Sequence, residues 1–186
     1  PFWLAENNGY TSDINRFIGN TEIKYDILPW LTVTERIGID SYTDDRKGKT
    51  NIGTRGTPNG YMYDQKISRS QINSDLTLTA SRDINQDFSV DVVVGNNINV
   101  RDYDSEFVDG TGLNVPDFFH VSNANTVTAD ESIEKIRLYS FYGQATIDYQ
   151  DYLYLTLTGR NDWSSTLPDN ENSYFYPSAS LGFVFT

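Results

Sequence analysis

Apolar and polar residues alternate along most of this chain, with the period of two that is typical of a β-strand with one apolar face. In the stretch RFIGNTEIKYDI, Phe17, Ile23 and Tyr25 fall on one face, whereas Glu22 and Lys24 fall on the other. The same alternation predicts seven strands, at residues 16–27, 31–40, 71–80, 88–100, 138–149, 153–163 and 174–185. No stretch has a convincing helical period, so the pattern predicts an all-β protein.

The connections between these strands differ regularly in length. Three are short, at residues 28–30, 82–87 and 150–151, and three are long, at residues 43–64, 102–132 and 164–173. Because short and long connections alternate, all short turns fall on one side of an antiparallel up-and-down meander and all long loops on the other. Soluble sandwiches favour short loops throughout, whereas outer-membrane barrels combine short periplasmic turns with long extracellular loops. The connections therefore favour part of a large transmembrane β-barrel.

The composition fits a protein whose strands cross a membrane better than a protein whose helices cross it. Hydrophobic residues make up 38% of the 186 residues, and no segment approaches the roughly 20 consecutive apolar residues of a membrane helix. Aromatic residues gather near both ends of the predicted strands, as at the two interfaces of a bilayer, although aromatic enrichment is typical of any β-sheet. Those near the short turns are Tyr25, Trp30, Phe88, Tyr149, Tyr152, Tyr154, Phe183 and Phe185, and those near the long loops are Tyr42, Tyr61, Tyr63, Tyr103, Trp163, Tyr174 and Tyr176.

The charge and the missing residue types exclude several classes of function. A formal net charge of −12 argues against nucleic acid as a partner, since a phosphate backbone requires a basic surface. The absence of cysteine excludes disulfides, thiolate catalysis and cysteine-ligated metals. His120, the only histidine, lies in a predicted long loop, where an exposed or packed loop residue is the simplest interpretation. We therefore expect no catalytic residue, no enzymatic activity and no cofactor.

One predicted loop faintly resembles a calcium site. RDYDSEFVDG offers Asp102, Asp104, Glu106 and Asp109 before Gly110, but it lacks the bidentate glutamate that closes a calcium loop. Solvated loop acids explain the segment better, so we expect no metal site.

Charged residues on the polar faces of the predicted strands are the candidate functional residues. In a barrel this face lines the lumen, where charges pair with one another, with a plug domain or with substrate. Structural pairing is the simplest of these roles. The candidates for lining the lumen or contacting substrate are Arg36, Asp40, Asp75, Asp91, Arg160, Asp162 and Trp163.

Two segments resemble a known family. TGRNDWSSTLP followed by NSYFYPSASLGFVF is similar to a strand–loop–strand of the SusC/RagA-type TonB-dependent outer-membrane transporters, and NRFIGNTEIKYDILPWLTVTERIGIDSYTDDR resembles an earlier hairpin of the same barrels. The resemblance implies a large barrel of roughly 22 strands with a plug domain, capped by a SusD-like surface lipoprotein and energised by the TonB complex. It also implies contact with lipid in the outer membrane of a Gram-negative cell.

We expect residues 1–186 to form part of a barrel, because seven strands cannot close a barrel of this size. We expect neither a plug domain nor a TonB-contacting segment in these residues. The start PFWLAENNGY has neither a basic stretch nor an apolar core, so we expect no signal peptide and interpret the chain as an excised or processed piece. The function that the resemblance implies is energy-coupled uptake of a small oligomeric nutrient, an oligosaccharide or a peptide. The alternative is a secreted or surface β-sandwich that binds carbohydrate.

Overall fold

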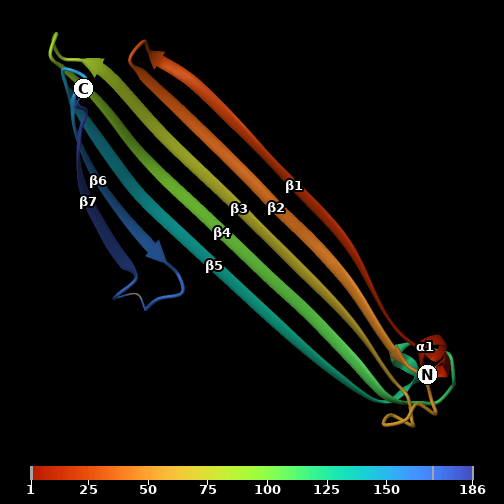
Figure 1. The fold of residues 1–186 in the computed structure, drawn as a ribbon. Helices are drawn as coiled ribbons and strands as arrows, with labels where there is room; N and C mark the ends of the chain where they lie inside the picture. Colours follow the sequence, from red (N-terminus) through yellow and green to blue (C-terminus); the bar gives the residue numbers. More distant parts are fainter. Residues whose placement is uncertain (1, 169, 186) are drawn as a thin grey trace. The chain divides into compact units, whose positions relative to one another are not determined.

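The computed structural model describes residues 2–168 and 170–185, and its main element is one sheet of seven strands (Figure 1). The strands are β1 (Asn8–Leu28), β2 (Leu31–Thr50), β3 (Tyr61–Asp83), β4 (Phe88–Leu113), β5 (Ala124–Tyr149), β6 (Leu153–Ser164) and β7 (Ser173–Phe183). They lie side by side in sequence order, so that each strand pairs with its neighbours in the chain. The predicted all-β, up-and-down meander is therefore confirmed.

Two short helical segments accompany the sheet. The helix α1 (Phe2–Asn7) precedes β1, and the 3-10 turn η1 (Val121–Asn123) precedes β5. The prediction of a chain without helices is wrong at α1, because six residues are too few to establish a helical period in the sequence. Among the described residues, neither segment has the length and apolar character needed to cross a membrane.

Most strands are longer than predicted. β2 continues past its predicted end at residue 40 to Thr50, and β4 continues past residue 100 to Leu113. Two of the predicted long loops consequently shrink to residues 51–60 and 114–123, whereas the three short turns lie where the sequence places them. The prediction was wrong here because neither face of these extensions is apolar, and the alternation that marks a strand is then lost.

Contacts within the sheet divide the chain into two parts, which are described separately. The loop part consists of Pro1–Phe17, Asp40–Ser70 and Asp102–Lys135 and contains the two shortened loops. The turn part consists of Ile18–Ile39, Gln71–Arg101 and Ile136–Thr186 and contains the three short turns.

The apolar face of the turn part is uncovered. Ile23 on β1, Val94 on β4 and Leu181 on β7 are 63%, 47% and 70% exposed. The buried hydrophobic side chains of the described residues, Met62, Ile67 and Leu113, all belong to the loop part. The turn part therefore presents its apolar side chains outward instead of packing them into a core.

Aromatic rings link the short-turn ends of β4, β5 and β7 through the turn that precedes β6. The ring centroids of Phe88 and Tyr149 lie 4.7 Å apart, those of Tyr149 and Tyr152 lie 5.4 Å apart, and those of Tyr152 and Phe183 lie 5.6 Å apart. This continuous row has the arrangement predicted for one interface of a bilayer. The aromatic residues predicted near the long loops divide between the two parts, with Trp163, Tyr174 and Tyr176 in the turn part and the others in the loop part.

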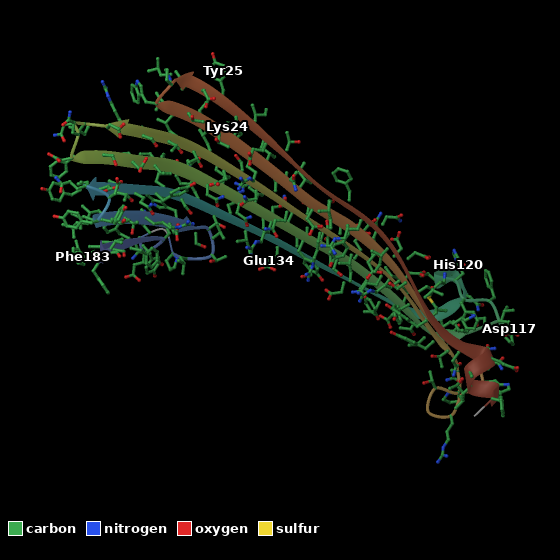
Figure 2. The ribbon with its side chains drawn as sticks, turned by 45° about the horizontal axis from the view of Figure 1, so that its top comes forward. Lys24, Tyr25, Asp117, His120, Glu134 and Phe183 are labelled. Carbon is green, nitrogen blue, oxygen red and sulfur yellow. The ribbon has the colours of Figure 1, made fainter. Side chains whose placement is uncertain are left out.

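Two buried asparagines hold the loops of the loop part. The side-chain amide of Asn51 donates to Asp117 Oδ1 at 2.6 Å, and that of Asn123 donates to the carbonyl oxygens of Val115 and Phe118 at 2.8 and 2.6 Å. Asp117 and His120, both labelled in Figure 2, belong to the same loop. Nδ1 of His120 accepts a hydrogen bond from the backbone N–H of Ser122 in η1 at 3.2 Å. The loop before β5 is thus fixed by amide hydrogen bonds, and His120 has a local capping role.

A tyrosine ring covers a glycine on the polar face of the turn part. A Cβ atom on Gly95 of β4 would lie 2.1 Å from Cζ of Tyr142 on β5, so only glycine leaves room for the ring. The Tyr142 hydroxyl reaches β3, where it donates to Asp75 Oδ1 at 3.0 Å and lies 3.1 Å from Thr77 Oγ1. This one side chain therefore connects three strands.

Alanine at position 95 is expected to displace the Tyr142 ring and break its hydrogen bonds to β3. We expect Gly95→Ala to lower the free energy of unfolding by about 1–3 kcal/mol, the usual cost of overpacking. The measurement is urea unfolding of the full-length parent protein in lipid. Gly38→Ala is the matched control, because a Cβ atom on Gly38 meets nothing within 4 Å. Equal effects of the two substitutions would contradict the role of the Tyr142 ring.

Candidate functional site

Hydrogen bonds between side chains cross the polar face of the turn part. Asn73 Oδ1 on β3 accepts from the side-chain amides of Asn97 and Asn99 on β4, at 3.1 and 3.2 Å. Asn99 Oδ1 in turn accepts from Arg101 Nε at 2.9 Å. Together with the bonds of Tyr142, these contacts form a polar layer over β3, β4 and β5.

An arginine–aspartate pair extends this layer to β6. Arg160 Nε donates to Asp162 Oδ1 at 2.7 Å, and Arg160 Nη2 donates to the hydroxyl of Ser140 on β5 at 3.0 Å. The guanidinium also lies 5.8 Å from the ring centroid of Tyr142. Ser140 is only 3% exposed, so the arginine is held by a buried partner.

The strand register places two tyrosines beside this pair. Arg160 is opposite Tyr142 on β5 and Tyr176 on β7, and Asp162 is opposite Ser140 on β5 and Tyr174 on β7. Directly opposed residues have Cβ atoms within about 4.5–5.5 Å, so these side chains are neighbours on one face.

A pocket of about 390 Å³ opens at this point of the turn part. Its lining residues are Asn97, Leu138, Ser140, Arg160, Asp162, Trp163, Ser164, Leu167, Tyr174 and Tyr176. Trp163 borders the pocket, but its ring packs 5.5 Å from that of Tyr139, a residue of the apolar face. The charged groups of the pocket are therefore Arg160 and Asp162, and its exposed aromatic surface comes from Tyr174 and Tyr176.

The structure distributes the seven predicted site residues over several places. Arg160, Asp162 and Trp163 meet at the pocket, and Asp75 is connected to them through Tyr142. Arg36 Nε donates to Glu22 Oε2 at 2.9 Å in the turn part, and Arg16 Nε donates to Asp40 Oδ1 at 2.9 Å in the loop part. Asp91 is exposed on β4. Arg36 and Asp40 are thus already occupied by pairing with a neighbouring strand.

Several residues of the pocket were not predicted as site residues. Tyr174 and Tyr176 belong to the aromatic residues predicted near the long loops, and Ser140 and Asn97 are not among the predicted candidates. The sequence contains one signal for these residues: Arg160 and Asp162 are two positions apart, and so are Tyr174 and Tyr176. That spacing puts each pair on one face, but the sequence does not give the register between their strands.

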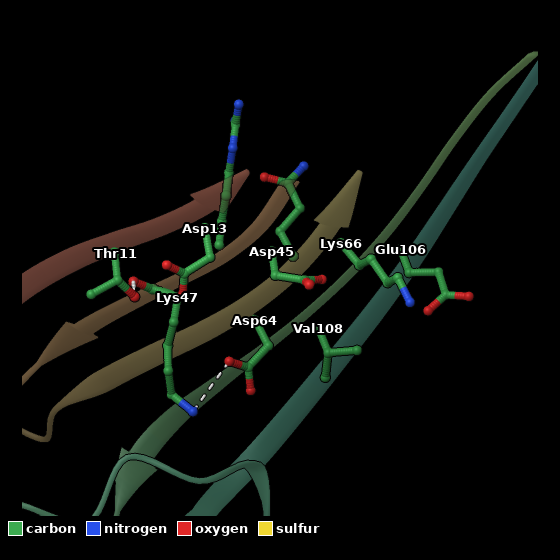
Figure 3. Close-up of a pocket in the computed structure, with 10 residues that line it drawn as sticks. Thr11, Asp13, Asp45, Lys47, Asp64, Lys66, Glu106 and Val108 are labelled. Carbon is green, nitrogen blue, oxygen red and sulfur yellow. Dashed lines mark hydrogen bonds and ion pairs between the residues drawn. The ribbon is translucent and has the colours of Figure 1, made fainter. Parts of the chain in front are cut away.

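A second pocket lies in the loop part and is lined mainly by charged side chains (Figure 3). It has a volume of about 370 Å³, and Lys47 Nζ lies 3.3 Å from Asp64 Oδ1 within it. Asp45, Lys66 and Glu106 also line it. Glu106 is one of the acids predicted in a calcium-like loop, and the structure places it on β4 in a strand instead. The site combines both signs of charge, which suits ion pairing within the sheet.

Comparison with known proteins identifies the family. The family model described as "TonB dependent receptor-like, beta-barrel" matches residues 1–186. The chain therefore belongs to the TonB-dependent receptor-like β-barrel family. A chain of the RagAB peptide transporter superposes with a TM-score of 0.87 at 16% sequence identity, over 94% of this chain and 20% of that chain. The siderophore receptor PiuA from Acinetobacter baumannii gives a TM-score of 0.51 at 13% identity, over 91% of this chain and 29% of that chain. No curated protein matches the sequence.

The family match confirms a TonB-dependent receptor barrel of the outer membrane, and the superposition shows that this chain shares the fold of the matching part of RagAB. The RagAB importer in its closed-closed state superposes equally well, with a TM-score of 0.86 at 16% identity, over 94% of this chain and 20% of that chain. The chain thus spans about a fifth of the length of the RagAB chains that it matches.

The buried carboxylate of Asp44 in the loop part makes the β1–β2 pairing sensitive to acid. The Ser12 hydroxyl, 2.6 Å from Asp44 Oδ1, lowers the pKa of Asp44, and Arg46 Nε at 2.7 Å from Oδ2 acts in the same direction. A folded-state pKa below the unfolded value of about 3.9 gives stability above that pH, which is lost as the pH falls through the folded pKa. We expect amide exchange of β1 and β2 near Ser12 and Asp44, corrected for its intrinsic rate, to accelerate below about pH 4. Asp44→Asn should remove this pH dependence, and an unchanged dependence would contradict the assignment.

Proposed function

We propose that this chain forms part of the wall of an outer-membrane transporter for energy-coupled nutrient uptake. The observation that supports this function best is the contrast between the two faces of the turn part. One face is apolar and uncovered, as lipid contact requires, and the other is a hydrogen-bonded polar layer with a pocket, as a lumen requires. The match to the TonB-dependent receptor-like β-barrel family supports this arrangement of one lipid-facing and one lumen-facing side.

A β-sandwich that binds carbohydrate accounts less well for the uncovered face. A sandwich buries the apolar face of one sheet against a second sheet. The described residues form a single sheet, and its apolar face is the more exposed one in the turn part. In water such a surface would favour aggregation, whereas in a bilayer it is solvated by lipid.

The proposed cargo is a small oligomeric nutrient, an oligosaccharide or a peptide. RagAB, whose chain has the same fold over this segment, is described as a peptide transporter. By analogy we propose a SusD-like surface lipoprotein as partner and the TonB complex as energy source, each acting through the whole transporter. Of the lumenal candidates, Arg160 and Asp162 would contact cargo, while Arg36 and Asp40 would strengthen the wall through their pairs with β1.

The two faces of β6 are expected to respond differently to a positive charge. Leu155 lies on the apolar face, so arginine there should destabilise the barrel by about 2–4 kcal/mol near the middle of the bilayer. Thr156 lies on the lumenal face, where its hydroxyl is 3.2 Å from that of Thr146, and arginine there should lose little more than that hydrogen bond. The measurement is the folded fraction of the full-length parent protein by heat-dependent gel mobility.

Leu155→Phe distinguishes lipid from a protein core. Lipid accommodates the larger ring, whereas a close-packed core loses about 1–3 kcal/mol to overpacking. Tolerance of phenylalanine together with intolerance of arginine at position 155 is the expected result. If phenylalanine is as harmful as arginine, or if Thr156→Arg is the more harmful substitution, the assignment of the two faces is wrong.

The loops and the turns are expected to lie on opposite sides of the membrane. A peptide tag inserted between Arg55 and Gly56 should be labelled on intact cells, because both residues are exposed at the tip of the 51–60 loop. The same tag at Asn85, in the short turn between β3 and β4, should be labelled only after the outer membrane is opened. Labelling of intact cells at Asn85 alone would invert the proposed orientation.

A further inference from the structure

The geometry points to the pocket around Arg160 as a subsite for one ring of a neutral saccharide. This assignment rests on the transport function proposed above and chooses between its two classes of cargo. Ligand sites commonly have volumes of about 300–1,000 Å³. The pocket, at about 390 Å³, lies at the small end of that range and suits one sugar ring of a longer chain.

The Arg160–Asp162 pair supplies a hydrogen-bond donor and an acceptor side by side. Arg160 uses Nε and Nη2 for Asp162 and Ser140, and Asp162 uses Oδ1 for Arg160. Among the described residues, neither Arg160 Nη1 nor Asp162 Oδ2 has a hydrogen-bond partner. An adjacent donor and acceptor match two neighbouring hydroxyl groups, each of which both donates and accepts.

Two exposed tyrosine rings flank the pair on β7. Tyr174 and Tyr176 are 47% and 54% exposed, and the register puts them opposite Asp162 and Arg160. An aromatic ring offers an apolar face to the C–H groups of a sugar ring while its hydroxyl remains available for hydrogen bonds. The subsite thus has an apolar wall beside a polar one, as a pyranose ring has an apolar face and a polar edge.

The polar wall is held in place before any ligand binds. The buried hydroxyl of Ser140 fixes the guanidinium of Arg160, and the carbonyl oxygen of Ser140 accepts from the side-chain amide of Asn96 at 3.0 Å. Groups that are already fixed lose little conformational entropy on binding, which favours weakly interacting neutral ligands.

An anionic ligand fits this subsite less well. The charge of Arg160 is balanced by Asp162 at 2.7 Å, so the carboxylate of a free peptide would meet the aspartate as well as the arginine. The chain also carries a formal net charge of −12, which disfavours anions in general. Neutral saccharides meet neither obstacle.

The test uses the full-length parent transporter in detergent, with an array of neutral oligosaccharides and a library of tripeptides as probes. We expect binding to neutral oligosaccharides. For the best of them, calorimetry should show about tenfold weaker binding for Tyr176→Ala and for Arg160→Ala, and little change for Tyr176→Phe, which keeps the ring. Tyr154→Ala, on the same face near the other end of β6, is the matched control and should bind like the unsubstituted protein.

Four results would overturn the assignment. Binding of tripeptides without oligosaccharides would leave the transport function intact and reject the saccharide subsite. Oligosaccharide binding that is insensitive to Tyr176→Ala and Arg160→Ala would place the sugar elsewhere. A loss of barrel stability in Tyr176→Ala with unchanged affinity would show that another segment of the transporter fills the pocket. Absence of binding to either array also rejects the subsite, whereas the transport function is tested separately by the charge substitutions on β6.

Discussion

Backbone hydrogen bonding in lipid is the constraint from which the rest of this structure follows. A bilayer offers no water to unpaired N–H and C=O groups, so a strand that crosses it must pair with a strand on each side. Pairing every strand with its sequence neighbours is the simplest solution, and within this chain β2 to β6 are paired in this way on both sides. The side chains then divide between lipid and lumen at every second residue, which explains both the alternation and the uncovered apolar face.

The same constraint governs the polar side chains on both faces. Among the described residues, no buried side-chain nitrogen or oxygen lacks a hydrogen-bond partner. Glu35 interrupts the apolar face of β2, and Ser74 on the neighbouring strand donates to it at 2.7 Å. On the lumenal face, Tyr142 satisfies Asp75 across the intervening Gly95. These contacts connect strands through side chains as well as through the backbone, so they add to the rigidity of the wall.

The sequence allowed prediction of features that depend on one strand at a time. The seven strands, their two faces and the short turns follow from the period of two and the apolar residues, because lipid demands a clean alternation. The extensions of β2 and β4 were missed, since water makes no such demand and both of their faces are polar. The pocket was only half predicted for another reason. Arg160 and Tyr176 lie on different strands, and their contact depends on a register that local pattern does not encode.

In the proposed transporter, pairing within the wall also determines which groups of the polar face remain available to cargo. Arg16, Arg36 and Arg46 each bond to a carboxylate on their own or a neighbouring strand, so their charges are largely balanced. Charges paired in this way attract a passing solute only weakly, although the net charge of the chain still disfavours anions. In the proposed transporter, selectivity would then come from short-range contacts at the few places where donors, acceptors and aromatic surface converge. In the turn part the pocket between β5, β6 and β7 is such a place, because its arginine is fixed and its tyrosines are exposed.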